Sequence, residues 1–316
     1  MRWFLFGVLV LLVGETFLSA EAWADKKDPD KTEKNDAKDS PLFVVPPTGG
    51  KEVKLTQWRF ILGTRHLSLP GDPPVKSQPE KPTGLEYLEF REDKSTTYQN
   101  GILTLVPLTS IRKIDYDHKM KRVALAVVNA DGKEETLTGS TKFVGINKVG
   151  LEAETVLEGL GAATVKFQGG SDKGVHSIRF PSPKPAVEAK GIASAIIAVD
   201  KTKHTVQTLQ PLYLIEGNYR VLPYLMFKKT LKLDMDKIVS MRFVPSEDKK
   251  ISHDFEVTLK GGAKNTLMLL TKIEADKDKS ATLEGLIGRV PSGYKLFPVH
   301  TIQELQTTLE DDKKGS

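Results

Sequence analysis

Apolar and polar residues alternate in short runs along most of the chain after Lys54, and Gly, Pro, Asn and Asp separate the runs. Ile102–Val106 and Phe255–Leu259 show the pattern clearly, since every second residue is apolar or small. Such alternation turns one face of a strand to a core and the other to water. A 3.6-residue period is nearly absent, with short helices expected only near residues 155–160 and 302–310. The sequence therefore predicts an all-β protein.

Four pairs of apolar runs have the form of β-hairpins. The pairs are Trp58–Leu62 with His66–Leu69, Val123–Val128 with Glu135–Thr138, Ala193–Val199 with His204–Leu209, and Phe255–Leu259 with Asn265–Leu269. Asp131-Gly132 and Gly261-Gly262 supply the positive φ angles that tight hairpin turns require. Each hairpin opens a unit that recurs along the chain.

Each unit continues with a third strand and closes on an isoleucine. The third strands contain Tyr87–Phe90, Leu157–Leu160, Tyr213–Gly217 and Leu283–Leu286, and the closing isoleucines are Ile111, Ile178, Ile238 and Ile302. Alternate units match best, because Tyr87-Leu88 recurs as Tyr213-Leu214 about 126 residues later. Leu157–Leu160 likewise matches Leu283–Leu286, and Val175–Ile178 matches Val299–Ile302. The pattern indicates a unit that was doubled, and a pair that was doubled again.

We therefore expect two tandem β domains, residues 54–181 and 186–307, separated by the proline-rich segment Pro181–Pro185. Each domain would contain two antiparallel, small-barrel or sandwich-like units of about 60 residues, a size that is only marginally stable alone. The rhythm is similar to that of small SH3-like or Sm-like barrels, a likeness that covers architecture only. The alternative is a single four-bladed propeller with one unit per blade.

The ends of the chain differ from this β pattern. Residues 1–24 combine Arg2, an apolar run and Ala22-Trp23-Ala24, which predicts a secretory signal peptide cleaved near Ala24. Residues 25–53 are predicted to be a charged flexible linker, Pro70–Pro82 an exposed loop, and residues 308–316 a disordered tail. We expect an exported protein, periplasmic or extracellular, whose mature chain has no transmembrane segment.

Composition narrows the possible chemistry. The chain has no cysteine, which excludes disulfides and thiolate metal sites. The formal net charge of +5 is small for 316 residues and the basic residues are scattered. We therefore expect no nucleic-acid partner.

No nucleophile motif or phosphate-binding glycine loop is present, so we predict no catalytic residue and no cofactor. Weak candidates for metal ligands are His176, His300, Asp115, Asp117 and His118. Asp115, Asp117 and His118 resemble a cluster of metal ligands just after a strand, where a solvated turn is the favoured interpretation. His176 and His300 each precede a closing isoleucine by two residues, and a polar strand end inherited by duplication is favoured over a ligand.

These observations favour an exported, non-enzymatic binding or scaffolding protein of the cell envelope or extracellular space. Its partner would be an envelope or extracellular protein or a polysaccharide. The alternative is a hydrolase that acts on an extracellular polymer through dispersed carboxylates, because two catalytic acids need no local spacing in sequence.

Overall fold

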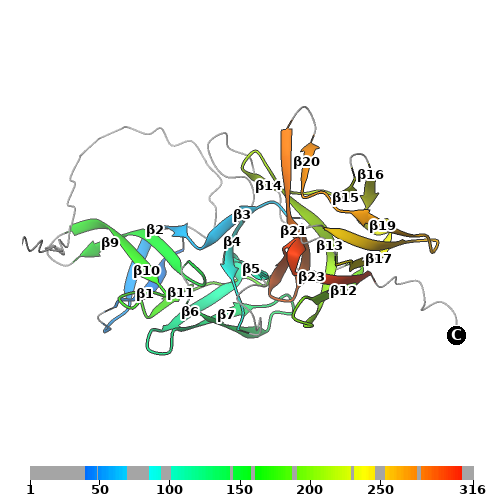
Figure 1. Cartoon of the computed structure of the whole chain (residues 1–316). Coiled ribbons are helices and arrows are strands. Elements are labelled where there is room, and N and C mark those ends of the chain that lie inside the picture. The colour runs from blue at the N-terminus through cyan, green and yellow to red at the C-terminus, as the bar shows by residue number, and fades with distance from the viewer. Residues whose placement is uncertain are drawn as a thin grey trace, which may run out of the picture. The chain divides into compact units, whose positions relative to one another are not determined.

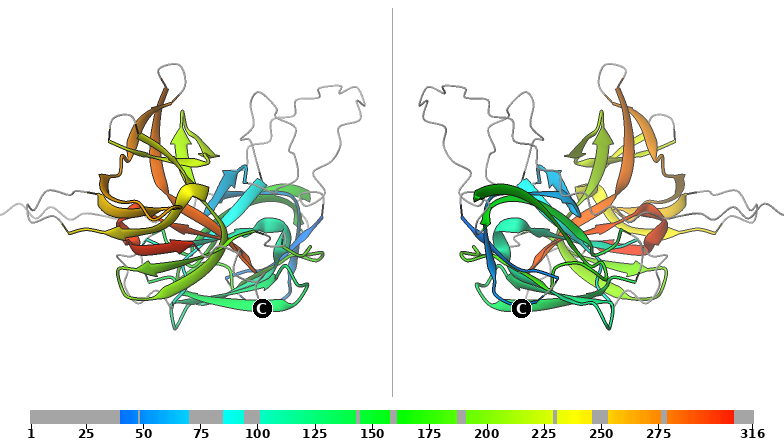
Figure 2. Two further views of the ribbon diagram at one scale, coloured as in Figure 1. Left: turned by 90° about the vertical axis from the view of Figure 1, so that its right-hand side faces the viewer. Right: turned by 90° about the vertical axis from the view of Figure 1, so that its left-hand side faces the viewer.

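A computed structural model describes residues 40–47, 49–69, 85–93, 101–142, 145–157, 161–186, 191–228, 231–245, 253–275 and 279–307. The predicted signal peptide, the linker up to residue 39, the Pro70–Pro82 loop and the tail lie outside these residues. The described segments are antiparallel strands and three short 3-10 helices, with no α-helix among them (Figures 1 and 2). The predicted all-β class is confirmed, and none of the sheets closes into a barrel.

The first sheet has eight strands and consists entirely of residues before Pro181. In spatial order these are β10 (Gly161–Gly169), β9 (Val149–Leu157), β2 (Val53–Leu62), β1 (Leu42–Val45), β11 (Ser177–Arg179), β6 (Ile111–Asp117), β7 (Arg122–Val128) and β8 (Glu134–Ser140). β1 was expected to belong to the linker of residues 25–53. It instead lies between β2 and β11, because the apolar run Leu42–Val45 buries Leu42 and Val44 completely.

The second sheet has thirteen strands and joins both parts of the chain. Its main order is β19 (Lys264–Met268), β18 (Asp254–Leu259), β17 (Ile238–Phe243), β23 (Ile302–Thr307), β12 (Ala193–Ala198), β13 (Lys203–Ile215), β21 (Lys279–Val290), β22 (Gly293–Phe297), β5 (Leu103–Pro107), β4 (Leu85–Phe90) and β3 (Thr64–Leu67). Two side branches, β14 (Asn218–Val221) and β20 (Lys272–Ala275), pair with β13 and β21. β15 (Tyr224–Phe227) and β16 (Leu231–Asp234) form a separate hairpin.

The two sheets contain the same arrangement of eight strands. In spatial order β10, β9, β2, β1, β11, β6, β7 and β8 correspond to β22, β21, β13, β12, β23, β17, β18 and β19. The corresponding strands also follow one another in the same order along the chain. We call residues 40–186 the first half and residues 191–307 the second half. Continuous sheets of this kind are not the separate four-stranded blades of a propeller. The predicted domain limits themselves stay predictions.

A pair of β-bulges supports this correspondence. The pairing of β2 with β9 shifts register between Thr56 and Arg59, and Gln57 between them has φ 46°. The pairing of β13 with β21 shifts between Gln207 and Gln210 in the same way, where Thr208 has φ 51°. A bulge inserts one unpaired residue and bends its strand. Both halves therefore bend the same strand at the same place.

Each half buries its own apolar core, and a third cluster lies where the halves meet. Ile114 and Leu125 lie in the first core, and Met241 and Val257 occupy the corresponding places in the second. The third cluster draws on both halves and contains Leu67, Leu69, Tyr87, Leu105, Leu212, Ile287, Tyr294 and Leu296.

Three of the four predicted hairpins are confirmed, namely β7 with β8, β12 with β13, and β18 with β19. The first, Trp58–Leu62 with His66–Leu69, is wrong. β2 pairs with β1 and β9, whereas β3 pairs with β4 in the other sheet. The chain changes sheets at Gly63, which has φ 86°. The local alternation of apolar and polar residues predicts both strands, but it does not predict which strands they pair with.

The predicted third-strand matches need correction as well. Tyr87–Phe90, with the sequence YLEF, corresponds in the structure to Tyr224–Phe227, with the sequence YLMF, and not to Tyr213. Both tetrapeptides pair with the strand that precedes a 3-10 helix. Leu283–Leu286 corresponds to the stretch around Gly150-Leu151, because Phe60 faces Leu151 where Pro211 faces Leu286. Residues 158–160 of the predicted match lie outside the described part of the chain.

Three of the four closing isoleucines share one local structure. Ile111, Ile238 and Ile302 each begin a strand directly after a 3-10 helix, namely η1 (Leu108–Ser110), η2 (Met235–Lys237) and η3 (Val299–Thr301). Ile178 lies in β11 without such a helix. It faces Ile114 as Leu305 faces Met241, so Ile178 corresponds to Leu305, and the predicted match of Val175–Ile178 with Val299–Ile302 is wrong. The helices expected near residues 155–160 and 302–310 are replaced by β9 and β23 in the described residues.

The halves are joined by backbone pairing between β5 and β22. Tyr294 faces Leu105 and Leu296 faces Leu103. Gly293 allows this approach, because a Cβ atom there would lie 2.3 Å from the Leu105 carbonyl oxygen, and its φ is 143°. The ring of Tyr294 packs edge-on against Tyr87 with centroids 5.8 Å apart. Strand addition satisfies backbone groups that an open edge would expose.

An arginine adds a polar contact to this junction. Nε of Arg65 on β3 donates to Oε1 of Glu89 on β4 at 2.5 Å, and Nη1 lies 3.9 Å from Oε2 of Glu284 on β21. Its guanidinium also lies 4.4 Å from the ring centroid of Tyr219 on β14. The Arg65 side chain is only 18% exposed. One cation therefore bridges strands of both halves.

Replacing Arg65 by methionine should lower the free energy of unfolding by about 1–3 kcal/mol, since two half-buried carboxylates lose their cation. Urea denaturation measures this change. Arg59→Met is the matched control, because Arg59 is 65% exposed and ion pairs at the surface contribute little. Equal losses of stability in the two variants would contradict a special role for Arg65 at the junction.

Candidate functional site

The first half carries a groove on the sheet face opposite its core, over β11, β6, β7 and β8. The groove has a volume of about 650 Å³. Its lining residues are Asp93, Asp115, Tyr116, Asp117, Arg122, Val123, Ala124, Thr138, His176 and Ser177. Three of the five predicted site residues, Asp115, Asp117 and His176, therefore lie in one groove.

Strand register explains why these residues meet. Ser177 faces Asp115, Asp115 faces Ala124, and Ala124 faces Thr138, which makes one row across four strands. Residues directly opposite one another share a face of the sheet. Ser177 and Ala124 are small, so the row leaves space between the larger side chains of Asp115, Arg122 and Asp117.

The polar groups of the groove are partly engaged. Asp115 pairs with Lys113 at 2.9 Å between Nζ and Oδ1. Oδ1 of Asp117 accepts a hydrogen bond from the backbone N–H of Met120 at 2.9 Å, which closes the turn after β6. The predicted solvated turn at this position is therefore also a rim of the groove. Carboxylates and the exposed guanidinium of Arg122 give the groove charges of both signs.

Two histidines lie side by side at the edge of the groove. His118 follows β6 and His176 precedes β11, and their ring centroids are 4.9 Å apart. The backbone N–H of Tyr116 donates to the carbonyl of His176 at 2.8 Å, which fixes the two segments together. His118 also lies parallel to the Tyr116 ring at 6.2 Å. His118 and His176 are far apart in the sequence and become neighbours only through the pairing of β6 with β11.

Tyr116 is a buried polar residue beside the groove. Its side chain is 6% exposed, and its hydroxyl has no hydrogen-bond partner among the described residues. Nε2 of His118 likewise has none. Burial raises the pKa of Tyr116 well above its usual range, so the phenol stays neutral.

The second half contains another pair of neighbouring histidines. His253 directly precedes β18 and His300 lies in η3 before β23. Strand register aligns Tyr116 with Phe243 and Ile178 with Leu305, so these histidines do not occupy the places of His118 and His176. Burial lowers the pKa of His253, and the charge of nearby His300 lowers it further. His176 and His300 therefore belong to different pairs in different halves.

Metal binding by these residues stays a prediction. Within the ranges that the structure describes, no three or more His, Cys, Asp or Glu side chains are grouped to hold a metal ion. None of the described segments forms a long apolar helix of the kind that spans a membrane.

Comparison of the chain with protein-family models, with curated proteins and with solved structures gives no match. The groove itself presents carboxylate acceptors and nitrogen donors among its lining residues.

Replacing His300 by glutamine should raise the pKa of His253 toward its ordinary value, because a repelling charge is removed. Burial still favours the neutral imidazole, so the pKa should stay below that of a free histidine. A histidine with a lowered pKa stabilises the fold above pH of about 6.5, and this contribution is lost as pH falls through the folded-state pKa.

An NMR titration of the imidazole protons measures the shift. His204 is the internal control, because its pKa is lowered by burial and by Lys295, and neither changes in the variant. An unchanged His253 titration in His300→Gln would show that the two histidines do not interact.

Proposed function

We propose that this chain is an exported binding or scaffolding protein of the cell envelope or extracellular space. The groove over β11, β6, β7 and β8 is the observation that supports it. A pocket of this size with a few polar groups on rigid strands is the usual form of a recognition site. The signal-like residues 1–24 support export.

The chemistry of the groove suggests what it binds. Asp93, Asp115 and Asp117 present carboxylates, while Arg122 and His176 present nitrogen donors. Hydroxyl-rich or amide-rich polymers offer both donors and acceptors to such a surface. We therefore propose an envelope or extracellular protein, or a polysaccharide, as the partner.

The test compares capture from native envelope and extracellular material by immobilised mature chains. The variant Asp115→Asn/Asp117→Asn removes the groove carboxylates and keeps similar side-chain shapes. We expect its yield of bound partner to fall by at least about tenfold, which corresponds to 1.4 kcal/mol. Mass spectrometry and glycan analysis identify what is bound.

The matched control is Arg242→Gln/Glu256→Gln. These residues face each other on β17 and β18, the strands that correspond to β6 and β7. The control should capture as much as the wild type. Equal capture by the groove variant would contradict the proposed site.

A hydrolase is the second candidate, because three carboxylates line the same groove and glycoside hydrolysis needs a pair of acids. The same variants decide between the two functions. If the wild type and the control release soluble fragments from a bound polymer and the groove variant does not, the protein is a hydrolase and not only a binding protein.

A further inference from the structure

Among the described residues, one strand and one sheet edge that correspond to the two sides of the β5–β22 junction have no such partner. β5 of the first half adds to β22 of the second. The strand that corresponds to β22 is β10, whose outer edge has no partner strand among the described residues. The strand that corresponds to β5 is β16, which pairs only with β15 in the described chain.

The hairpins β4–β5 and β15–β16 correspond residue by residue. Tyr87 faces Pro107 and Leu88 faces Val106, as Tyr224 faces Asp234 and Leu225 faces Leu233. A 3-10 helix follows directly in both cases, η1 after Pro107 and η2 after Asp234. Thr104 and Leu105 of β5 therefore correspond to Leu231 and Lys232 of β16.

The acceptor edges also correspond in register. Leu151 faces Phe167 on β10, as Leu286 faces Phe297 on β22. Counting from these phenylalanines, Thr164 and Val165 correspond to Tyr294 and Lys295. At the existing junction, Tyr294 faces Leu105 and Lys295 faces Thr104.

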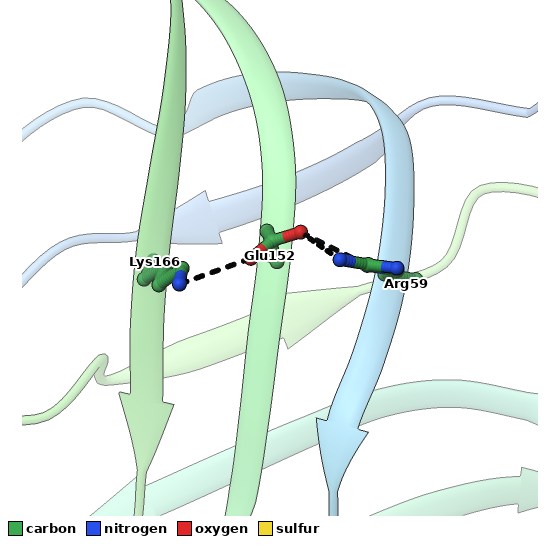
Figure 3. A network of polar contacts seen from close by, with 3 residues as sticks. All are labelled: Arg59, Glu152 and Lys166. Carbon is green, nitrogen blue, oxygen red and sulfur yellow. Dashed lines mark hydrogen bonds and ion pairs between the residues drawn. The ribbon is translucent and has the colours of Figure 1, made fainter. Parts of the chain in front are cut away.

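The two acceptor sheets differ in the chemistry of one face. In the second half, Ile287 and Leu296 are buried in the shared third cluster. Glu152 and Lys166 occupy the corresponding places in the first half, and Figure 3 shows Glu152 between Lys166 and Arg59.

Glu152 is paired on both sides. Oε1 accepts from Nε of Arg59 at 2.9 Å and Oε2 lies 3.2 Å from Nζ of Lys166. The hydrogen bonds from Arg59 and then Lys166 lower the pKa of Glu152, which keeps it charged. A strand that adds to β10 must therefore be polar on this face, where β5 is apolar.

β16 has that polarity. It carries Lys232 at the place where β5 carries Leu105. In the added strand, Lys232 would face Thr164 of β10. Thr164 in turn faces Glu154 of β9, whose carboxylate is exposed and lies within reach of a lysine at this place. On the other face, Leu231 is 38% exposed and would meet Val165, a half-buried residue that packs against the first core. Leu231 and Lys232 of β16 thus match Val165 and Thr164 of β10 in polarity.

We propose that β16 of one molecule adds to β10 of a second copy, in the register of the internal junction between β5 and β22. The contact is head-to-tail, because it joins different surfaces of the two copies. Each added copy presents a new free β10 or β16, so assembly continues beyond the dimer unless a ring closes. The proposal does not depend on the groove or on its ligand.

Multi-angle light scattering of the full mature chain from micromolar to submillimolar concentration tests the proposal. The mass of the wild type should rise in steps of one chain and pass that of a dimer. Leu231→Asp places a charge against Val165 and should weaken association by at least about tenfold. A wild type that stays monomeric throughout, or a Leu231→Asp variant that assembles like it, would overturn the proposal.

A mixing experiment tests the direction of assembly. Val165→Asp places a charge in the β10 edge that would accept β16. Thr164→Lys weakens the same contact to a smaller extent, because the new lysine would oppose Lys232. Thr164 is exposed, so this second variant does not disturb the core. Leu231→Asp and Val165→Asp should each be monomeric alone and should form a dimer, and nothing larger, when mixed. If Val165→Asp does not fold, Thr164→Lys replaces it, and a several-fold weakening is then expected.

Thr136→Lys on β8, at the opposite edge of the same sheet, is the matched control and should assemble like the wild type. Failure of the mixed variants to form a dimer, or weakening by Thr136→Lys equal to that by Thr164→Lys, would overturn the head-to-tail contact. The groove variant should assemble normally, so this result and the capture experiment fail or succeed separately.

Discussion

The backbone pairing of β5 with β22 is the contact on which the rest of the described structure depends. A strand at the edge of a sheet exposes unpaired N–H and C=O groups, and an added strand satisfies them. This addition brings Leu105 and Tyr87 of the first half against Ile287 and Leu296 of the second, which creates the third apolar cluster. Without the pairing, those side chains would face water.

One local difference decides which half donates its hairpin. β2 ends at Leu62, and at Gly63 the chain leaves for β3 and β4 in the other sheet. β13 continues to Ile215 and turns back through Glu216 and Gly217, whose φ angles are 47° and 77°. Two successive positive φ angles are typical of tight hairpin turns, so β14 stays on β13. The two halves are thus alike in their eight-stranded arrangement and differ in the connections that follow β2 and β13.

Alternation of apolar and polar residues was sufficient to predict the all-β class, because burial on one face imposes a period of two. Asp131-Gly132 and Gly261-Gly262 were sufficient to predict two hairpins, because turn geometry is local. Partners distant in sequence could not be predicted in this way. YLEF at Tyr87 was matched to Tyr213, although its counterpart is YLMF at Tyr224.

The same limit applies to the site. Asp115 and Asp117 were identified from their spacing, but the neighbourhood of His118 and His176 arises from the pairing of β6 with β11. Export, the domain limits and the function stay predictions.

Amide hydrogen exchange of β5 and β22 tests the central claim most directly, because it reports whether their backbone groups are paired in solution. The structure predicts that these amides exchange as slowly as those of β6 and β11 inside the first sheet. Fast exchange in β5 and β22, with β6 and β11 still protected, would contradict the joining of the two halves by strand addition.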